Sequence, residues 1–123
     1  MSPTAISPKS ARQEVEFMEI NNIFENLPVD LSQEVIERIA FNPNVRVERI
    51  VSRGHITPEG FWYDQSQTEW VILLQGTAEL QFEGESFVRY LRSGDHLVIP
   101  PHKRHRVAQT SLAPVAIWLA VFY

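Results

Sequence analysis

The sequence predicts an all-β domain, a sandwich or barrel of short strands, with one short helix near the N-terminus. Residues 77–83 alternate between apolar and polar side chains, which is the period of a strand with one buried face. The turn-forming pairs Gly84-Glu85 and Gly94-Asp95 recur at the close spacing typical of antiparallel strands. The C-terminal run VAIWLAVFY (115–123) is apolar on both faces and predicts a strand in a covered position.

The bulk properties limit the possible functions. A chain of 123 residues with 44% hydrophobic and 21% charged residues is long enough for one domain with a real core. The net charge of −4 argues against non-specific nucleic-acid binding, and the basic cluster 103–106 is too short to change that. The absence of cysteine excludes disulfides, thiolate zinc sites and cysteine nucleophiles. Without a membrane-length apolar run or an apolar signal core, we expect a soluble cytoplasmic protein that binds no membrane.

The N-terminal part predicts a tail followed by the single domain. Residues 1–16 are polar with two Ser-Pro pairs, so we expect a flexible tail and a domain over 17–123. Within that domain, Phe17 to Phe24 would pack on the outer wall. Asp30 is a suitable N-cap for a helix over about 30–41, which Asn42-Pro43-Asn44 would end. The apolar face of this helix would carry Leu31, Val35, Ile36, Ile39 and Ala40.

From Val45 the pattern changes to short strands separated by turns. The first, VRVERIVS, interleaves β-branched and charged residues as a half-exposed strand does. Regular turns between many short strands are typical of a sandwich or barrel. The expected strands cover residues 45–52, 69–75, 77–83, 86–92, 106–110 and 115–123.

The stretch from Gly94 to Gln109 concentrates imidazole in one loop. Three of the chain's four histidines lie within it, and the Pro100-Pro101 pair forces an extended corner just before His102 and His105. His96 follows the Gly94-Asp95 turn directly, so we expect it to point outward. His55, in a Gly-rich turn, is expected on the surface.

The spacing of Gly94, Pro100 and His105 resembles the second motif of the cupin superfamily, in which the histidine is a metal ligand. Upstream, Glu69 is followed by six residues and Gly76, which resembles the end of the first cupin motif. The two half-motifs stand in the right order. The resemblance implies a double-stranded β-helix, or jelly-roll barrel, and a homodimer.

This sequence departs from the cupin pattern at four positions. Tyr63 and Gln65 stand where the family has two histidines, His102 replaces a glycine, and Gln109 replaces an asparagine. Because residues two apart in a strand face the same way, Tyr63 and Gln65 share a face that the period can carry on to Glu69.

The resemblance implies Glu69 and His105 as retained metal ligands, with Gln65 or His102 completing the set. Such a mixed nitrogen and oxygen set suits Zn, Fe, Mn, Ni or Cu. Tyr63, Gln65 and Trp62 would line the pocket. Two alternatives remain open: Glu69 could pair with Arg104 or Arg106, and His102 could be an exposed loop residue.

Two functions follow from these residues. The first is a cupin with one divalent metal that acts on a small oxygenated metabolite by dioxygenation, isomerisation or decarboxylation. The second is a metal-free module in which Tyr63, Gln65, Glu69 and His105 hydrogen-bond a small polar ligand, without catalysis. In either case the partners expected are a small molecule and, through residues 115–123, a second copy of the chain.

Overall fold

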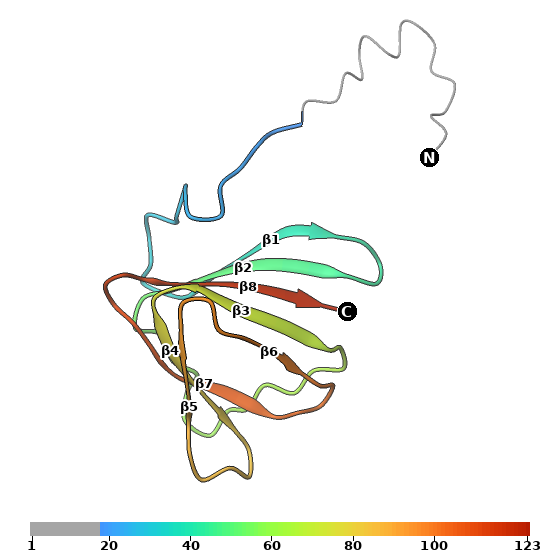
Figure 1. Ribbon diagram of the computed structural model, residues 1–123, viewed down its shortest axis with the longest axis vertical. Coiled ribbons are helices and arrows are strands. Elements are labelled where there is room, and N and C mark those ends of the chain that lie inside the picture. The colour runs from blue at the N-terminus through green and yellow to red at the C-terminus, as the bar shows by residue number, and fades with distance from the viewer. Residues whose placement is uncertain (1–17) are drawn as a thin grey trace, which may run out of the picture.

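The computed structural model describes residues 18–123, which form two antiparallel β-sheets around one core (Figure 1). The larger sheet has five strands in the order β1-β2-β8-β3-β6, and the smaller has three in the order β5-β4-β7. The predicted all-β jelly-roll architecture is confirmed, whereas the expected tail over 1–16 lies outside the described residues. The strands are β1 (Val35–Phe41), β2 (Arg46–Ser52), β3 (Glu69–Gln75), β4 (Thr77–Phe82), β5 (Arg89–Arg92), β6 (His96–Ile99), β7 (His105–Thr110) and β8 (Ala116–Phe122).

The helix predicted over residues 30–41 is wrong. Val35–Phe41 form strand β1, and residues 18–123 contain no helix. The Asp30 side chain accepts a hydrogen bond from the Ser32 N–H at 2.9 Å, but this contact makes an isolated turn and caps nothing. The segment 42–45, read as a helix stop, is the hairpin turn between β1 and β2, held by the bond from the Asn42 N–H to the Val45 carbonyl at 2.9 Å.

Tertiary pairing explains this difference. β1 pairs in antiparallel register with β2 from Val35–Val51 to Phe41–Arg46, with one irregularity after Arg38. The stretch is rich in β-branched side chains, which pack well on a pleated surface and lose rotamer freedom in a helix. The helical periodicity was therefore a weak local preference that the backbone bonds to β2 override.

The chain crosses from the larger sheet to the smaller at Gly76. This residue has φ +87°, and an added Cβ would lie 2.5 Å from the Ser111 hydroxyl oxygen and 3.1 Å from the Val115 carbonyl oxygen. Only glycine fits here without displacing backbone. The turns predicted at Gly84 and Gly94 are also confirmed, since both residues have positive φ.

Strand β8 lies between β2 and β3 at the centre of the five-stranded sheet. Its inward residues Trp118, Ala120 and Phe122 belong to the core, while Ile117 on the opposite face is also fully buried. The apolar character of the C-terminal run on both faces thus corresponds to a central strand.

Part of the N-terminal segment lies against the outer face of this sheet. Arg49 is buried, pairs with Glu37 at 2.7 Å, and donates to the carbonyls of Ile23, Glu25 and Asn26 at 2.7–3.1 Å. Ile20, in contrast, is fully exposed. The expected packing of residues 17–24 therefore holds only at its C-terminal end, and Phe17 lies outside the described residues.

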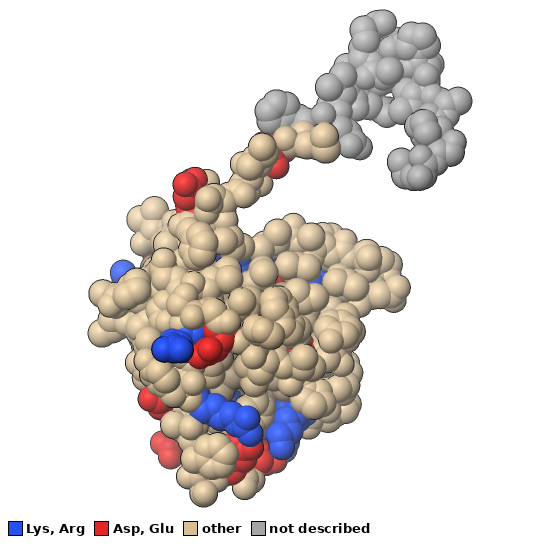
Figure 2. All heavy atoms as spheres, in the orientation of Figure 1, with Lys and Arg blue, Asp and Glu red and all other residues tan. Residues whose placement is uncertain are grey.

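The described residues contain no helix of the length and apolarity needed to cross a bilayer. On the face shown in Figure 2, the basic side chains at the lower end lie beside acidic ones. The ion pairs Arg89–Glu85 at 2.7 Å and Arg104–Glu83 at 3.4 Å belong to the β4–β5 hairpin and the loop beside it.

Candidate functional site

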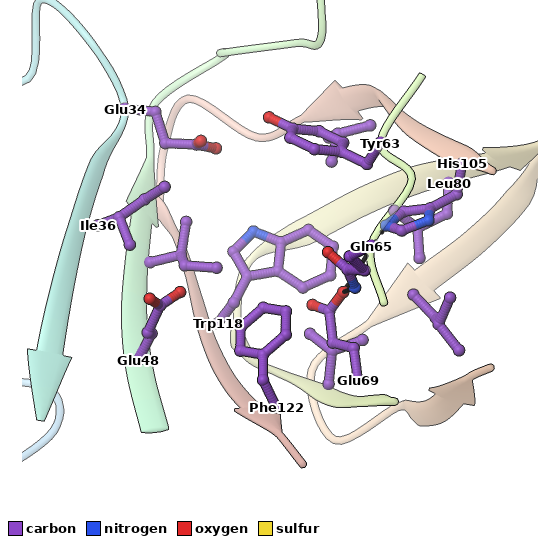
Figure 3. A pocket seen from close by; sticks show the side chains of 14 residues that line it. Glu34, Ile36, Glu48, Tyr63, Gln65, Glu69, Leu80, His105, Trp118 and Phe122 are labelled. Carbon is purple, nitrogen blue, oxygen red and sulfur yellow. Dashed lines mark hydrogen bonds and ion pairs between the residues drawn. The ribbon is translucent and has the colours of Figure 1, made fainter. Parts of the chain in front are cut away.

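A cavity of about 110 Å³ opens between the inner face of the five-stranded sheet and the segment 63–65 (Figure 3). Its walls are mainly apolar, and the rings of Trp118 and Phe122 lie at its centre in this view. Apolar walls with a few convergent polar groups are typical of small-molecule sites. The polar residues that line it are Glu34, Glu48, Tyr63, Gln65, Glu69 and His105.

A short backbone bridge brings two distant parts of the site together. The Tyr63 N–H donates to the His105 carbonyl at 2.7 Å, and the His105 N–H donates to the Tyr63 carbonyl at 3.1 Å. Two residues further on, the Gln65 carbonyl accepts a bond from the His102 N–H at 2.7 Å. Because Tyr63 and Gln65 are two apart in extended chain, both side chains reach the cavity.

Glu69 begins β3, between Ile99 of β6 and Phe122 of β8, and its side chain is only 9% exposed. The Gln65 amide nitrogen donates to the Glu69 Oε1 at 2.7 Å. Burial raises the pKa of the Glu69 carboxyl above its ordinary value, although the bond from Gln65 and the nearby His105 oppose the rise. The carboxyl therefore holds its proton to a higher pH than an exposed glutamate.

His105 begins β7 and its side chain is 7% exposed. Its Nδ1 lies 2.8 Å from the Lys103 carbonyl oxygen, which can only accept, so Nδ1 carries a proton. In the neutral ring, Nε2 then has the free lone pair. Nε2 lies 3.7 Å from the Glu69 Oε1 on the cavity side. The histidine can thus accept a proton or a hydrogen bond from a molecule in the cavity.

Tyr63 closes the cavity beside His105, with the two ring centroids 5.7 Å apart. Burial, helped by the charge of Glu34, raises the pKa of the Tyr63 phenol, which therefore stays protonated and can donate a hydrogen bond. Trp62, expected to line the same pocket, is not among the lining residues.

His102 does not lie at the cavity with Gln65, Glu69 and His105. Its side chain is 68% exposed, and its Nδ1 lies 2.8 Å from the Asp64 Oδ1. The backbone of His102 has φ +61°, the left-handed region that favours glycine, at the position where the cupin motif has glycine. His102 therefore adopts a backbone conformation that suits glycine, and its imidazole is directed into solvent.

The other pairings expected of Glu69 are also not formed. Arg104 pairs with Glu83 at 3.4 Å, and Arg106 donates to Gln81 at 3.2 Å and to the Thr57 carbonyl at 3.1 Å. His96 is exposed, as predicted, and accepts a bond from the Trp70 indole at 3.2 Å. His55 is half-buried and takes no part in the cavity.

The residues present do not fit a transition-metal centre. A catalytic metal takes about three protein ligands, and no group of three His, Cys, Asp or Glu side chains able to hold a metal occurs within residues 18–123. Glu69 and His105 lie together, but the amide nitrogen of Gln65 already binds the carboxylate. That amide donates to Oε1, the same carboxylate oxygen that lies 3.7 Å from the His105 Nε2.

Sequence reasoning missed the two carboxylates Glu34 and Glu48. Glu34 precedes β1 and accepts a bond from the Ser52 hydroxyl at 2.8 Å, and Glu48 lies in β2 beside Arg46. Alternation along β2 puts Glu48 on the same face as Ile50, which was the available signal. Because the sequence predicted a helix over 30–41, the strand alternation that would place Glu34 on the cavity side was not recognised.

Comparison with known proteins agrees with this architecture. A family model described as Cupin domain matches residues 51–122. No curated protein matches the chain. A solved structure from Ralstonia eutropha JMP134, provisionally named a mannose-6-phosphate isomerase, is 39% identical, covers 85% of this chain and 97% of its own, and superposes with a TM-score of 0.81.

More distant structures share the fold alone. A cupin superfamily protein from Desulfitobacterium hafniense DCB-2 is 18% identical over 78% of this chain and 82% of its own, with a TM-score of 0.65. KdgF from a Halomonas species is 20% identical over 78% of this chain and 83% of its own, with a TM-score of 0.60. From the matched family model and the two packed sheets, the chain belongs to the cupin superfamily.

Proposed function

We propose that this cupin binds a small oxygenated molecule in the cavity without a metal ion. The observation that carries the proposal is the 2.7 Å bond between the Gln65 amide nitrogen and the Glu69 carboxylate. In a metal-binding cupin that carboxylate would face a cation shared with histidines. Here an amide and a phenol stand in the two histidine positions, and they supply hydrogen bonds to a ligand in place of a metal.

The remaining polar groups suit a ligand that carries hydroxyl or carbonyl oxygens. The Tyr63 phenol can donate, and His105 Nε2 can accept or, once protonated, donate. Both lie against apolar walls, where a hydrogen bond contributes more than it does in water. The 39% identical protein is named as an isomerase of a sugar phosphate, and only the hydroxyls and the carbonyl of the sugar part belong to this class of ligand groups.

The same groups can move a proton within the cavity. His105 Nε2 lies 3.7 Å from a carboxyl whose pKa is raised by burial, so a proton acceptor and a proton donor stand together in the cavity. Proton transfer next to a carbonyl group is the reaction that this pair supports. For the metal-dependent reactions implied by the motif resemblance, no third His, Cys, Asp or Glu side chain joins Glu69 and His105 within residues 18–123.

The test combines metal analysis with ligand binding on the purified, untagged protein. After reloading with Zn, Fe, Mn, Ni and Cu in turn and desalting, we expect much less than one metal ion per chain. In a thermal-shift screen of small hydroxy and carbonyl compounds, we expect binding that persists in a chelator. It should weaken by about tenfold in His105→Ala, which loses one buried hydrogen bond, and stay unchanged in His102→Ala.

One outcome would overturn the proposal directly. Near-stoichiometric metal that both Glu69→Ala and His105→Ala abolish would establish a metal centre with these two residues as ligands. Ligand binding that a chelator removes would lead to the same conclusion.

A further inference from the structure

The cavity carries an excess of negative charge. Three carboxylates line it, those of Glu34, Glu48 and Glu69, whereas no Lys or Arg is among its lining residues within the described chain. The Arg46 guanidinium binds the Glu48 Oε2 at 2.7 Å and lies over the Phe122 ring at 4.2 Å. Arg46 therefore balances Glu48, burial favours the uncharged form of Glu69, and the Glu34 carboxylate has no Lys or Arg beside it among the described residues that line the cavity.

Each of these carboxylates keeps an oxygen for a ligand. Ser52 binds Oε2 of Glu34, Arg46 binds Oε2 of Glu48, and Gln65 binds Oε1 of Glu69. The second oxygen of each carboxyl has no hydrogen-bond partner among residues 18–123. A ligand that donates hydrogen bonds can satisfy these oxygens, whereas an anion cannot.

The acids lie around the aromatic centre of the cavity. In Figure 3, Glu34 and Glu48 extend from the β1–β2 side toward Trp118, and His105 lies on the opposite side. Aromatic ring faces attract cations, and their attraction is stronger where water is excluded. The Trp118 ring and the carboxylates therefore both favour a positively charged ligand.

The buried imidazole of His105 also indicates that the cavity binds a ligand. His105 is 7% exposed, and its Nε2 has no hydrogen-bond partner within 3.5 Å in the part of the chain that the structure describes, since the Glu69 Oε1 is 3.7 Å away. A buried polar atom on the wall of a cavity indicates a ligand group opposite it. It therefore places one hydrogen-bonding group of the ligand at His105, across the cavity from Glu34 and Glu48.

We propose that the cavity selects a small organic cation, an amine that also carries a hydroxyl or carbonyl oxygen, and rejects phosphate esters. This inference rests on the proposed function and specifies its ligand class. The ammonium group would donate to the free oxygens of Glu34 or Glu48 and lie against Trp118. A phosphate dianion would meet three carboxylates with no lining Lys or Arg to balance it.

The experiment uses three probes that share one apolar body: benzylamine, benzyl alcohol and benzyl phosphate. Titration calorimetry on the full chain at neutral pH gives their dissociation constants, with mannose 6-phosphate as a fourth probe. We expect benzylamine to bind about tenfold more tightly than benzyl alcohol, and neither phosphate to bind detectably. Raising the salt concentration should weaken the amine more than the alcohol.

Variants in which glutamine replaces a cavity glutamate test which carboxylates cause the preference for the amine. Glu34→Gln and Glu48→Gln should each reduce the amine-to-alcohol preference by about threefold or more, because each weakens amine binding more than alcohol binding. Glu85→Gln is the matched control, because Glu85 lies outside the cavity and pairs with Arg89 at 2.7 Å. Circular dichroism shows whether each variant is folded, and the two cavity variants test the inference independently.

The outcomes separate the two proposals. If benzyl alcohol binds as tightly as benzylamine and His105→Ala weakens both, the cation inference fails and the proposed function stands. Tighter binding of either phosphate would also overturn the inference. If none of the probes binds, both proposals fail for this ligand class.

Discussion

Two acid–histidine pairs lie on the same two segments of chain, and they differ in almost every physical respect. Asp64 and His102 approach to 2.8 Å with side chains 44% and 68% exposed. Glu69 and His105 are further apart, at 3.7 Å, with side chains only 9% and 7% exposed. The closer pair lies in solvent, and the looser pair lies at the wall of the cavity.

Burial, more than the distance between the partners, explains why these two acid–histidine pairs differ in chemistry. Water and salt screen the Asp64–His102 contact, and exposed ion pairs contribute about 0–1 kcal/mol. Burial keeps the Glu69 carboxyl protonated to a higher pH and leaves the His105 Nε2 available to a ligand. The pair that we propose to bind the ligand is therefore Glu69 and His105, whose side chains do not form a hydrogen bond with each other.

The largest expected effect on stability comes from removing the amide that supports the buried pair. In Gln65→Ala, the Glu69 Oε1 loses its hydrogen bond inside the protein. We expect the free energy of unfolding to fall by about 1–3 kcal/mol, the usual loss when a buried polar group is left unpaired. Urea denaturation at neutral pH measures it.

Asp64→Ala is the matched change in the exposed pair. It should lower the free energy of unfolding by less than about 1 kcal/mol. Equal losses in the two variants would show that burial does not distinguish the two pairs.

The pH dependence of stability gives the next test. Because burial raises the folded-state pKa of Glu69, the folded protein binds the proton more tightly than the unfolded chain does. The stability from this group is fully present below the ordinary pKa of 4.5 and is lost as the pH rises through the raised folded value. Glu69→Gln has no proton to lose, so wild type should lose stability relative to this variant across that window.

Urea unfolding of both proteins at a series of pH values from about 4 to 8 checks this direction. Asp64→Asn serves as the exposed control, with an expected difference from wild type within about 0.5 kcal/mol at each pH. A wild type that gains stability relative to Glu69→Gln with rising pH would contradict the assignment.

The smallest effect concerns the backbone of the exposed pair. His102 has φ +61°, where a residue with a Cβ is strained by roughly 1 kcal/mol. His102→Gly relieves this strain but loses the contact with Asp64 and gains freedom in the unfolded chain, so its unfolding free energy should stay within about 1 kcal/mol of wild type. His102→Ala keeps the strain and should be the less stable of the two. Thermal unfolding of both variants measures the order.

Some features of this protein follow from local sequence. The turns at Gly84 and Gly94 need a residue that tolerates positive φ, and the alternation of residues 77–83 sets which side chains face the core. The spacing of Tyr63, Gln65 and Glu69 likewise predicts a common face, because the strand period is a property of the backbone itself.

Other features depend on partners far away in the chain. Residues 35–41 became a strand only by pairing with β2, and that pairing carries Glu34 and Ile36 to the cavity. The direction of His102 likewise depends on how its loop is bound to the segment 63–65.

The all-β class, the turns and the resemblance that marks Glu69 and His105 can thus be read from the amino-acid order. The acids that surround those two residues, and the histidine that faces solvent, depend on the folded arrangement of the strands. Backbone period and turn chemistry depend only on a few neighbouring residues. Burial and the charge of a cavity depend on side chains from several strands, which come together only in the folded chain.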